Sequence, residues 1–234
     1  MVAYFYKGVM ATNNKQYKVR HLTMDDIEHI LQLQELVVQT LDNQDILQPL
    51  SYDEYQYIMD GKGMIIGAFA DDRLIAFRAL LIPPSDDSEH LGLDVGLKEE
   101  ELPTVIYQEI SNVHPDYRGN RLQQKLAQLI MNELSALDHS FKYVCCTVMP
   151  SNIPSLKDKL AQGMVIAALK EKYQGRLRYV LVKKLHENAC ENWTDTKALS
   201  INKIKEQQTL LKEGWLGFTL QKDEDHYKVV YGKI

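Results

Sequence analysis

The chain has 234 residues, of which 45% are hydrophobic and 25% are charged, so its composition is that of an ordinary globular protein. The formal net charge of −5 gives no basic excess, and a nucleic-acid partner is therefore not expected. No apolar stretch approaches the roughly 20 residues that span a bilayer, which predicts a cytoplasmic protein without a membrane partner.

The first eighty residues show strand and helix periods in turn. Two capping-box patterns, at Thr23–Asp26 and Ser51–Glu54, mark the starts of two helices. The expected elements are a strand at Tyr17–His21, a helix at Ile27–Leu41, a short helix toward Met59, and a hairpin of Met64–Ala70 with Leu74–Leu81.

The middle of the chain continues this alternation after a long loop or broken helix at residues 82–103. The adjacent Cys145 and Cys146 lie in an apolar run in which neighbouring side chains point to opposite faces, so we expect buried free thiols. The expected elements are a strand at Val105–Val113, a helix at Leu122–Leu137, a strand at Phe141–Val148, a helix at Ser155–Ala161, strands at Met164–Leu169 and Arg178–Lys184, and a turn at Tyr173–Gly175.

The pattern changes after His186. A polar stretch is followed by a helix at Leu199–Lys212 and by two strands at Trp215–Leu220 and His226–Tyr231. About fifty residues with one hairpin bury too little surface to fold alone. We therefore divide the chain into a main domain at residues 1–186 and a C-terminal helix and hairpin extension at 187–234, which packs on the main domain or on a partner subunit.

One segment, Tyr107 to Leu126, combines features that suit an anion. Its strand breaks at Pro115, turns at Gly119 and enters a helix whose first N–H groups and positive dipole end are flanked by Arg118 and Arg121. Such a helix start suits a phosphate or diphosphate, although any turn from strand to helix has some of these features.

This segment resembles the central motif of the GNAT superfamily of acetyl-CoA dependent N-acetyltransferases, of a bacterial type whose substrate is unassigned. The shared residues are Val113, Pro115, Tyr117, Arg118 and Gly119. The resemblance covers about residues 17–186. It implies an α+β fold, with a central, mostly antiparallel twisted sheet of six to seven strands, flanked by helices and splayed at its central strands.

The resemblance also implies a site for acetyl-CoA as co-substrate. Arg121 and Gln123 stand where the family has glycine or a small residue, and Arg121 could pair with the diphosphate instead. Downstream, Asn152 and Ser155 match a coenzyme-contacting pair, although without the resemblance a plain helix cap explains them better. The implied coenzyme-binding residues are Val113, Arg118, Gly119, Asn120, Arg121, Leu122, Gln123, Asn152 and Ser155.

The implied reaction is direct acetyl transfer to a primary amine in a ternary complex. Glu109 is the candidate base, with a solvated edge residue or a structural ion pair as the alternative. The main chain near Val113 would donate to the oxyanion. Lys159 stands where the family often has a tyrosine that protonates the leaving thiolate, so Lys159, Tyr173 or water are the candidates. His114 is expected to face solvent, and no metal-ligand spacing is present.

Two other functions remain open. A degenerate domain that binds CoA or another ligand without turnover is suggested by Arg121, Gln123 and Lys159. The other possibility is an interaction module, in which an exposed edge of the C-terminal hairpin pairs with another subunit to form a homodimer. The resemblance implies that residues 41–60, 82–103 and 170–178 are the candidate substrate segments. Their acids and tyrosines favour a cationic small-molecule or peptide amine as acceptor.

Overall fold

A computed structural model describes residues 3–137, 140–187, 192–224 and 226–233. The chain divides into two compact units. The first contains residues 1–82 and 107–139, and the second contains residues 83–106 and 140–234. In the described part of the chain, no helix is long and apolar enough to cross a membrane.

The first unit is built on five strands in the order β1-β2-β3-β4-β5. Every neighbouring pair in this set is antiparallel. The strands are β1 (Tyr6–Val9), β2 (Gln16–His21), β3 (Gly63–Ala70), β4 (Arg73–Leu81) and β5 (Val105–Val113), of which β5 starts in the second unit. The sequence predicted four of these strands, and it missed β1.

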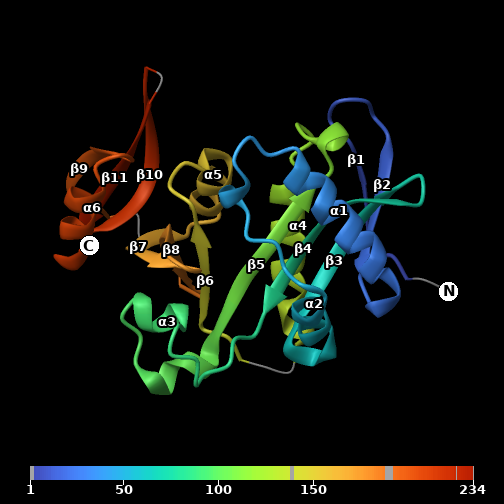
Figure 1. The fold of residues 1–234 in the computed structure, drawn as a ribbon, viewed down its shortest axis with the longest axis horizontal. Coiled ribbons are helices and arrows are strands. Elements are labelled where there is room, and N and C mark those ends of the chain that lie inside the picture. Colours follow the sequence, from blue (N-terminus) through green and yellow to red (C-terminus); the bar gives the residue numbers. More distant parts are fainter. Residues whose placement is uncertain (1–2, 138–139, 188–191, 225, 234) are drawn as a thin grey trace. The chain divides into compact units, whose positions relative to one another are not determined.

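Helices cover both faces of these strands (Figure 1). Helices α1 (Ile27–Gln39) and α2 (Tyr52–Tyr57) lie on one face, and α4 (Leu122–Asn132) packs against β3 and β4 on the other. Short helical turns adjoin them: η1 (Met24–Asp26), η2 (Gln44–Ile46), the π-type turn η3 (Ile58–Lys62), η5 (Pro115–Tyr117) and η6 (Glu133–Ala136).

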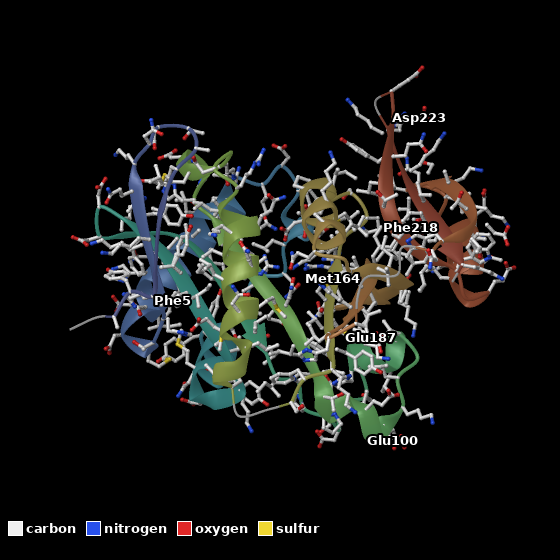
Figure 2. All side chains as sticks on the ribbon, turned by 180° about the vertical axis from the view of Figure 1, so that it is seen from behind. Phe5, Glu100, Met164, Glu187, Phe218 and Asp223 are labelled. Carbon is white, nitrogen blue, oxygen red and sulfur yellow. The ribbon has the colours of Figure 1, made fainter. Side chains whose placement is uncertain are left out.

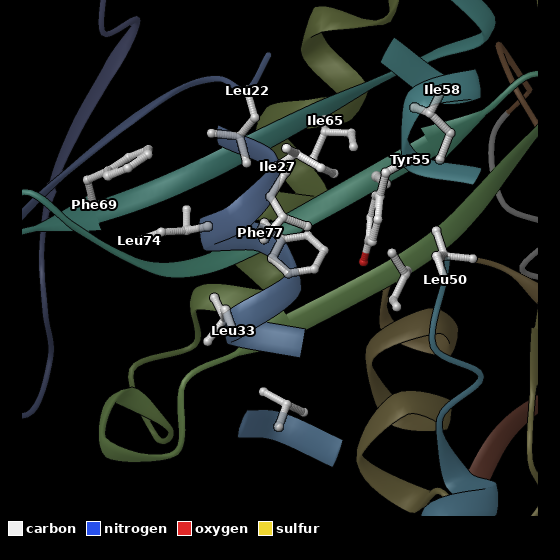
Figure 3. Packing of buried hydrophobic residues seen from close by; sticks show 14 residues of the cluster. Leu22, Ile27, Leu33, Leu50, Tyr55, Ile58, Ile65, Phe69, Leu74 and Phe77 are labelled. Carbon is white, nitrogen blue, oxygen red and sulfur yellow. The ribbon is translucent and has the colours of Figure 1, made fainter. Parts of the chain in front are cut away.

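The core under α1 and α2 is shown in Figure 3. Phe77 of β4 packs edge-on against Tyr55 of α2, with ring centroids 6.0 Å apart. The Tyr55 hydroxyl donates to Gln34 Oε1 at 2.7 Å, and the Gln34 amide exchanges two hydrogen bonds with the backbone of Leu50. This buried network fixes the segment between the two helices, since each of its polar groups is paired.

The second unit contains six strands in the order β6-β8-β7-β10-β11-β9. The pairs β6–β8, β8–β7, β7–β10, β10–β11 and β11–β9 are all antiparallel. The strands are β6 (Tyr143–Val148), β7 (Val165–Lys172), β8 (Arg176–Lys184), β9 (Thr194–Ser200), β10 (Leu216–Asp223) and β11 (His226–Lys233), with helices α5 (Ile153–Ala161) and α6 (Ile204–Lys212).

The predicted long loop is a broken helix held on β7. It contains α3 (Leu91–Asp94) and η4 (Glu99–Thr104). The buried ammonium of Lys172 binds the Glu89 carboxylate at 2.7 Å and Asp94 at 2.9 Å, and Lys170 binds Asp94 at 2.7 Å. These ion pairs attach the segment to the strand.

The C-terminal extension joins the second unit through Gln207 of α6. This side chain is fully buried, and its Oε1 accepts hydrogen bonds from Tyr179 of β8 and Tyr231 of β11. Its Nε2 donates to the carbonyl groups of Ser200 and Ile201.

An aromatic stack also holds the C-terminal hairpin. Figure 2 labels Phe218 on β10, and the ring of Phe218 stacks on Trp193 with the ring centroids 4.5 Å apart.

Two expectations about strands were wrong. The described residues form eleven strands rather than six to seven, because the chain adds β1 before the resembled region and β9, β10 and β11 after it. The hairpin β10–β11 was expected to have an exposed edge, but β7 and β9 pair with its two sides. The mostly antiparallel arrangement is confirmed, whereas the splay, the homodimer and the division at residue 186 stay predictions.

Candidate functional site

The strand β5 carries a bulge at Glu109. Leu80 pairs with Gln108, and Arg78 pairs with Ser111. Between these two pairs β4 has one residue, whereas β5 has two, so β5 contains one extra residue. An extra residue of this kind bends a strand and turns a side chain toward a new direction. The carboxyl group of Glu109 is half-buried and lies near Tyr55, whose pKa is raised by burial and by the charges of Glu54 and Glu109.

The segment after β5 is fixed by His114, which the sequence predicted to face solvent. That prediction was wrong, because the side chain is buried and its Nε2 accepts a hydrogen bond from Arg73 at 2.7 Å. Burial lowers the pKa of His114, and the positive charge of Arg73 lowers it further. The backbone N–H of His114 donates to the Ile75 carbonyl at 2.8 Å, which extends the pairing of β5 with β4.

The turn from η5 into α4 contains two residues in the left-handed region. Gly119 has φ +81° and Arg121 has φ 55° and ψ 24°. A left-handed backbone costs a non-glycine residue about 1–2 kcal/mol, so Arg121 holds this conformation against its own preference. A glycine would adopt this backbone without that cost.

The start of α4 has an anion-binding character. Its N-cap residue Arg121 makes no side-chain hydrogen bond to the helix, and the first N–H groups of any helix have no acceptor within it. A Cβ built on Gly119 would meet only the Thr12 methyl, at 3.9 Å, within a 4 Å radius. The exposed Arg118 and Arg121 flank this opening, so a phosphate here would find donors, positive charge and space.

Other predicted residues of the turn have defined partners. The Arg118 guanidinium donates to Thr40 Oγ1 at 3.0 Å, at the end of α1. Asn120 uses its side chain to bind Thr12 and the Tyr117 carbonyl. Leu122 is buried under the helix start and acts in packing. These contacts hold the turn on both sides.

Behind the turn lies Arg78, a fully buried arginine of β4. Its guanidinium donates to Gln108 Oε1 at 2.5 Å and to the Gln123 carbonyl at 3.3 Å. The hydrogen bond to Gln123 connects the first turn of α4 with the buried side of β4. Gln123 therefore takes part in the site through its main chain, while its half-buried side chain stands at the position of the family's small residue.

The second unit holds the other predicted residues. Asn152 is the N-cap of α5, and its Oδ1 accepts from the Ser155 N–H at 3.2 Å, which is the plain helix cap that the sequence left open. Lys159 is buried on the same helix. Tyr173 is exposed in the turn between β7 and β8, and its hydroxyl lies 3.2 Å from Thr147 Oγ1.

The structure thus places Glu109, Val113 and residues 118–123 in the first unit. Asn152, Ser155, Lys159 and Tyr173 belong to the second unit. Sequence reasoning missed three residues that support the turn from distant parts of the chain: Thr12 in the turn between β1 and β2, and Arg73 and Arg78 on β4. No local pattern marks them, because Thr12 and Asn120 are 108 residues apart.

Among the described residues no cluster of three or more His, Cys, Asp or Glu side chains is arranged to hold a metal ion. Comparison of the sequence with protein-family models gives no match, and comparison with curated proteins gives none at a significant level. Similarity appears only when the structure is compared with solved structures.

Three solved structures show this similarity. Arabidopsis thaliana NAA60 in complex with acetyl-CoA is 16% identical, with a TM-score of 0.56 over 73% of this chain and 99% of that chain. The ribosomal-protein-S18-alanine N-acetyltransferase of Escherichia coli is 12% identical, with a TM-score of 0.51 over 76% and 99%. An acetyltransferase of the GNAT family from Streptococcus pneumoniae is 14% identical, with a TM-score of 0.52 over 72% and 99%.

The chain therefore has the fold of the GNAT N-acetyltransferases. The likeness covers nearly the whole of each solved chain and about three quarters of this one. At these identities it shows the fold, and the activity has to be argued from the residues.

Proposed function

We propose that the protein transfers an acetyl group from acetyl-CoA to a primary amine of a small molecule or peptide. The observation that carries this proposal is the turn at residues 118–122. On a GNAT fold, it combines two left-handed residues, a helix start without a side-chain cap and two exposed arginines. Free backbone N–H groups at a helix start and arginine side chains are the partners that bind a diphosphate in proteins.

The coenzyme would bind with its diphosphate at the start of α4. The N–H groups of this first turn and the guanidinium groups of Arg118 and Arg121 supply donors and positive charge. Arg118 would exchange its hydrogen bond with the exposed end of α1 for a phosphate oxygen. The side chain of Gln123 is larger than the family residue, so tight binding requires that it lie along the helix.

Transfer would begin with a neutral amine. Glu109, displaced by the bulge in β5, would first take a proton from the bound ammonium group. The neutral amine nitrogen would then attack the thioester carbonyl carbon, and the second proton that the nitrogen loses would balance the one taken up by the thiolate. The C–N bond forms, the C–S bond breaks, and the CoA thiolate leaves and takes up a proton. A main-chain N–H near Val113 would stabilise the oxyanion.

The proton for the thiolate has three candidate sources, Lys159, Tyr173 and water. Lys159 is buried and Tyr173 is exposed, so their environments differ strongly. The acceptor is proposed to be cationic before it loses its proton, because Glu109 and acids of the candidate substrate segments favour such an amine.

A titration with acetyl-CoA, CoA and ATP tests the coenzyme site, read as a thermal shift and by calorimetry. Acetyl-CoA at one hundred times its dissociation constant should add about 2.7 kcal/mol of stability. Arg118→Ala should weaken this effect, and Lys212→Ala, which removes an exposed cation from α6, should leave it unchanged. Absence of any effect of acetyl-CoA on the wild-type protein would overturn the proposal.

Binding without acetyl transfer to a panel of polyamines, lysine peptides and peptide N-termini would favour the alternative function, a CoA-binding domain without turnover. Release of the CoA thiol, measured with a thiol reagent, separates the two. Turnover that requires both acetyl-CoA and an amine would establish the transferase.

A further inference from the structure

The turn between β1 and β2 lies beside the turn that precedes α4 (Figure 1). Thr12 donates twice to Asn120 Oδ1, from its N–H at 3.0 Å and from its hydroxyl at 2.9 Å. The Asn120 Nδ2 in turn donates to the Tyr117 carbonyl at 3.1 Å. The amide of Asn120 therefore connects the N-terminal hairpin with the segment that leads into Gly119 and Arg121.

The β1–β2 turn is itself a fixed structure. The Met10 N–H donates to the Lys15 carbonyl at 2.9 Å, and the Met10 side chain is almost fully buried. Asn13 accepts from the Lys15 N–H at 3.0 Å, and the Lys15 ammonium lies 3.3 Å from Asp71. A turn held at its base in this way can restrain what its tip touches.

A second contact joins the same two elements. The ammonium of Lys125, on the first turns of α4, lies 4.5 Å from the ring centroid of Tyr6 on β1, which is a cation–π distance. The hairpin thus touches both the turn and the helix of the candidate coenzyme site. Neither contact is visible in the sequence, since β1 precedes the region that resembles the family.

The conformation of the turn needs such support. Within three residues the chain holds Gly119 and Arg121 at positive φ, and Arg121 is not a residue that prefers it. Asn120 lies between them, and its side chain makes three hydrogen bonds, two with Thr12 and one with the Tyr117 carbonyl. Loss of these bonds would let residues 118–122 relax away from the arrangement that presents their N–H groups.

We propose that the β1–β2 turn is a positioning element of the coenzyme site. Thr12 holds Asn120, and Asn120 holds residues 118–122 in the conformation that binds the diphosphate of an acyl-CoA. The proposal rests on the proposed function, because it names a structural requirement of the same site. It makes Thr12 a positioning residue and not a catalytic one.

Isothermal titration with acetyl-CoA tests this role in the full chain. Thr12→Val removes the hydroxyl donor, and Asn120→Ala removes the acceptor. Thr12→Val removes one neutral hydrogen bond and should raise the dissociation constant about fivefold. Asn120→Ala removes all three hydrogen bonds of the Asn120 side chain and should raise it at least as much. The double variant should bind no more weakly than Asn120→Ala alone, since both changes remove the same contact. Thr12→Ser should restore most of the affinity.

Thr209→Val, which removes an exposed hydroxyl on α6, serves as the matched control and should bind normally. Hydrogen exchange without ligand supplies a direct readout, in which residues 118–122 should exchange faster in Thr12→Val while the strands β3 and β4 keep their protection.

If the wild-type protein binds acetyl-CoA and both Thr12→Val and Asn120→Ala bind it with the same affinity, the positioning role is overturned and the proposed function stands. Additive losses in the double variant would also overturn it, since the two side chains would then act independently. Failure of the wild-type protein to bind acetyl-CoA would instead remove the proposed function itself.

Discussion

The guanidinium of Arg20 and the carboxylate of Asp26 form two hydrogen bonds, of 2.7 and 2.6 Å, between the end of β2 and the start of α1. The Asp26 carboxylate also accepts from the Thr23 N–H at 3.0 Å, which closes the capping box. Both side chains are largely buried. The pair fixes the angle at which the chain leaves the sheet and enters its first helix.

Asp26→Asn should therefore destabilise the protein by about 3 kcal/mol, because it leaves a buried guanidinium without its charge partner. Urea unfolding followed by circular dichroism measures this loss. Asp25→Asn, at the exposed neighbouring position, is the control and should change stability by less than about 0.5 kcal/mol.

The same pair predicts a pH dependence. Burial alone would raise the pKa of Asp26, but the hydrogen bonds from Arg20 and Thr23 outweigh it, and the pKa is lowered. A carboxyl group with a lower pKa in the folded state contributes stability above its unfolded pKa of about 3.9 and loses it as the pH falls further. The acid slope of unfolding free energy should be shallower in Asp26→Asn than in the wild type. Equal slopes would contradict this account.

Gln207→Leu should cost about 3 kcal/mol. The change leaves the hydroxyls of Tyr179 and Tyr231 buried without their common acceptor, and two carbonyl groups lose their donor. Gln208→Ala, which removes one hydrogen bond to the Leu169 carbonyl, should cost about 1 kcal/mol. Chemical denaturation measures the free energy of unfolding of both variants. Similar losses would mean that the buried network of Gln207 stabilises the protein no more than the single hydrogen bond of Gln208 does.

The two adjacent cysteines should resist alkylation in the native protein. Cys145 and Cys146 are buried free thiols, Cys146 lies 3.7 Å from the sulfur of Met164, and burial raises the pKa of the Cys145 thiol. Since the thiolate is the reactive form, N-ethylmaleimide should label both only after unfolding. Peptide mass spectrometry identifies the labelled sites, and rapid native labelling of either cysteine would show that the strand opens.

Glu109→Gln should lower kcat by about a hundredfold or more if Glu109 is the base, with little change in acetyl-CoA affinity. The amide keeps the size of the side chain at the bulge but cannot accept the proton. Rates measured against pH should then lose their rise on the acidic side. Unchanged turnover would assign the proton transfer to water, and weaker coenzyme binding would indicate that the bulge itself had shifted.

The local elements near the site followed from the sequence. The predicted strand at Val105–Val113 coincides with β5, and the predicted helix start at Leu122 is the first residue of α4. Period-two and period-3.6 apolar patterns, with Pro115 and Gly119 between them, are local signals and survive folding. The buried free state of Cys145 and Cys146 followed from the same alternation.

Contacts between distant segments could not be predicted in this way. His114 reads as a variable polar residue in a turn, but Arg73, 41 residues earlier, gives it a buried partner. The strand β1 is short and half-exposed, so its four residues carry little apolar pattern, and pairing with β2 decides its conformation.

The sequence by itself determined the order of most elements, the motif at residues 113–119 and the resemblance to GNAT acetyltransferases, because these depend on neighbours along the chain. Only the tertiary structure decided how the turn at residues 118–122 is supported. Arg121 keeps a left-handed backbone, and Asn120 meets Thr12 across 108 residues. Such support depends on hydrogen bonds between strands and turns that come together only when the sheet forms, and no spacing in the sequence records them.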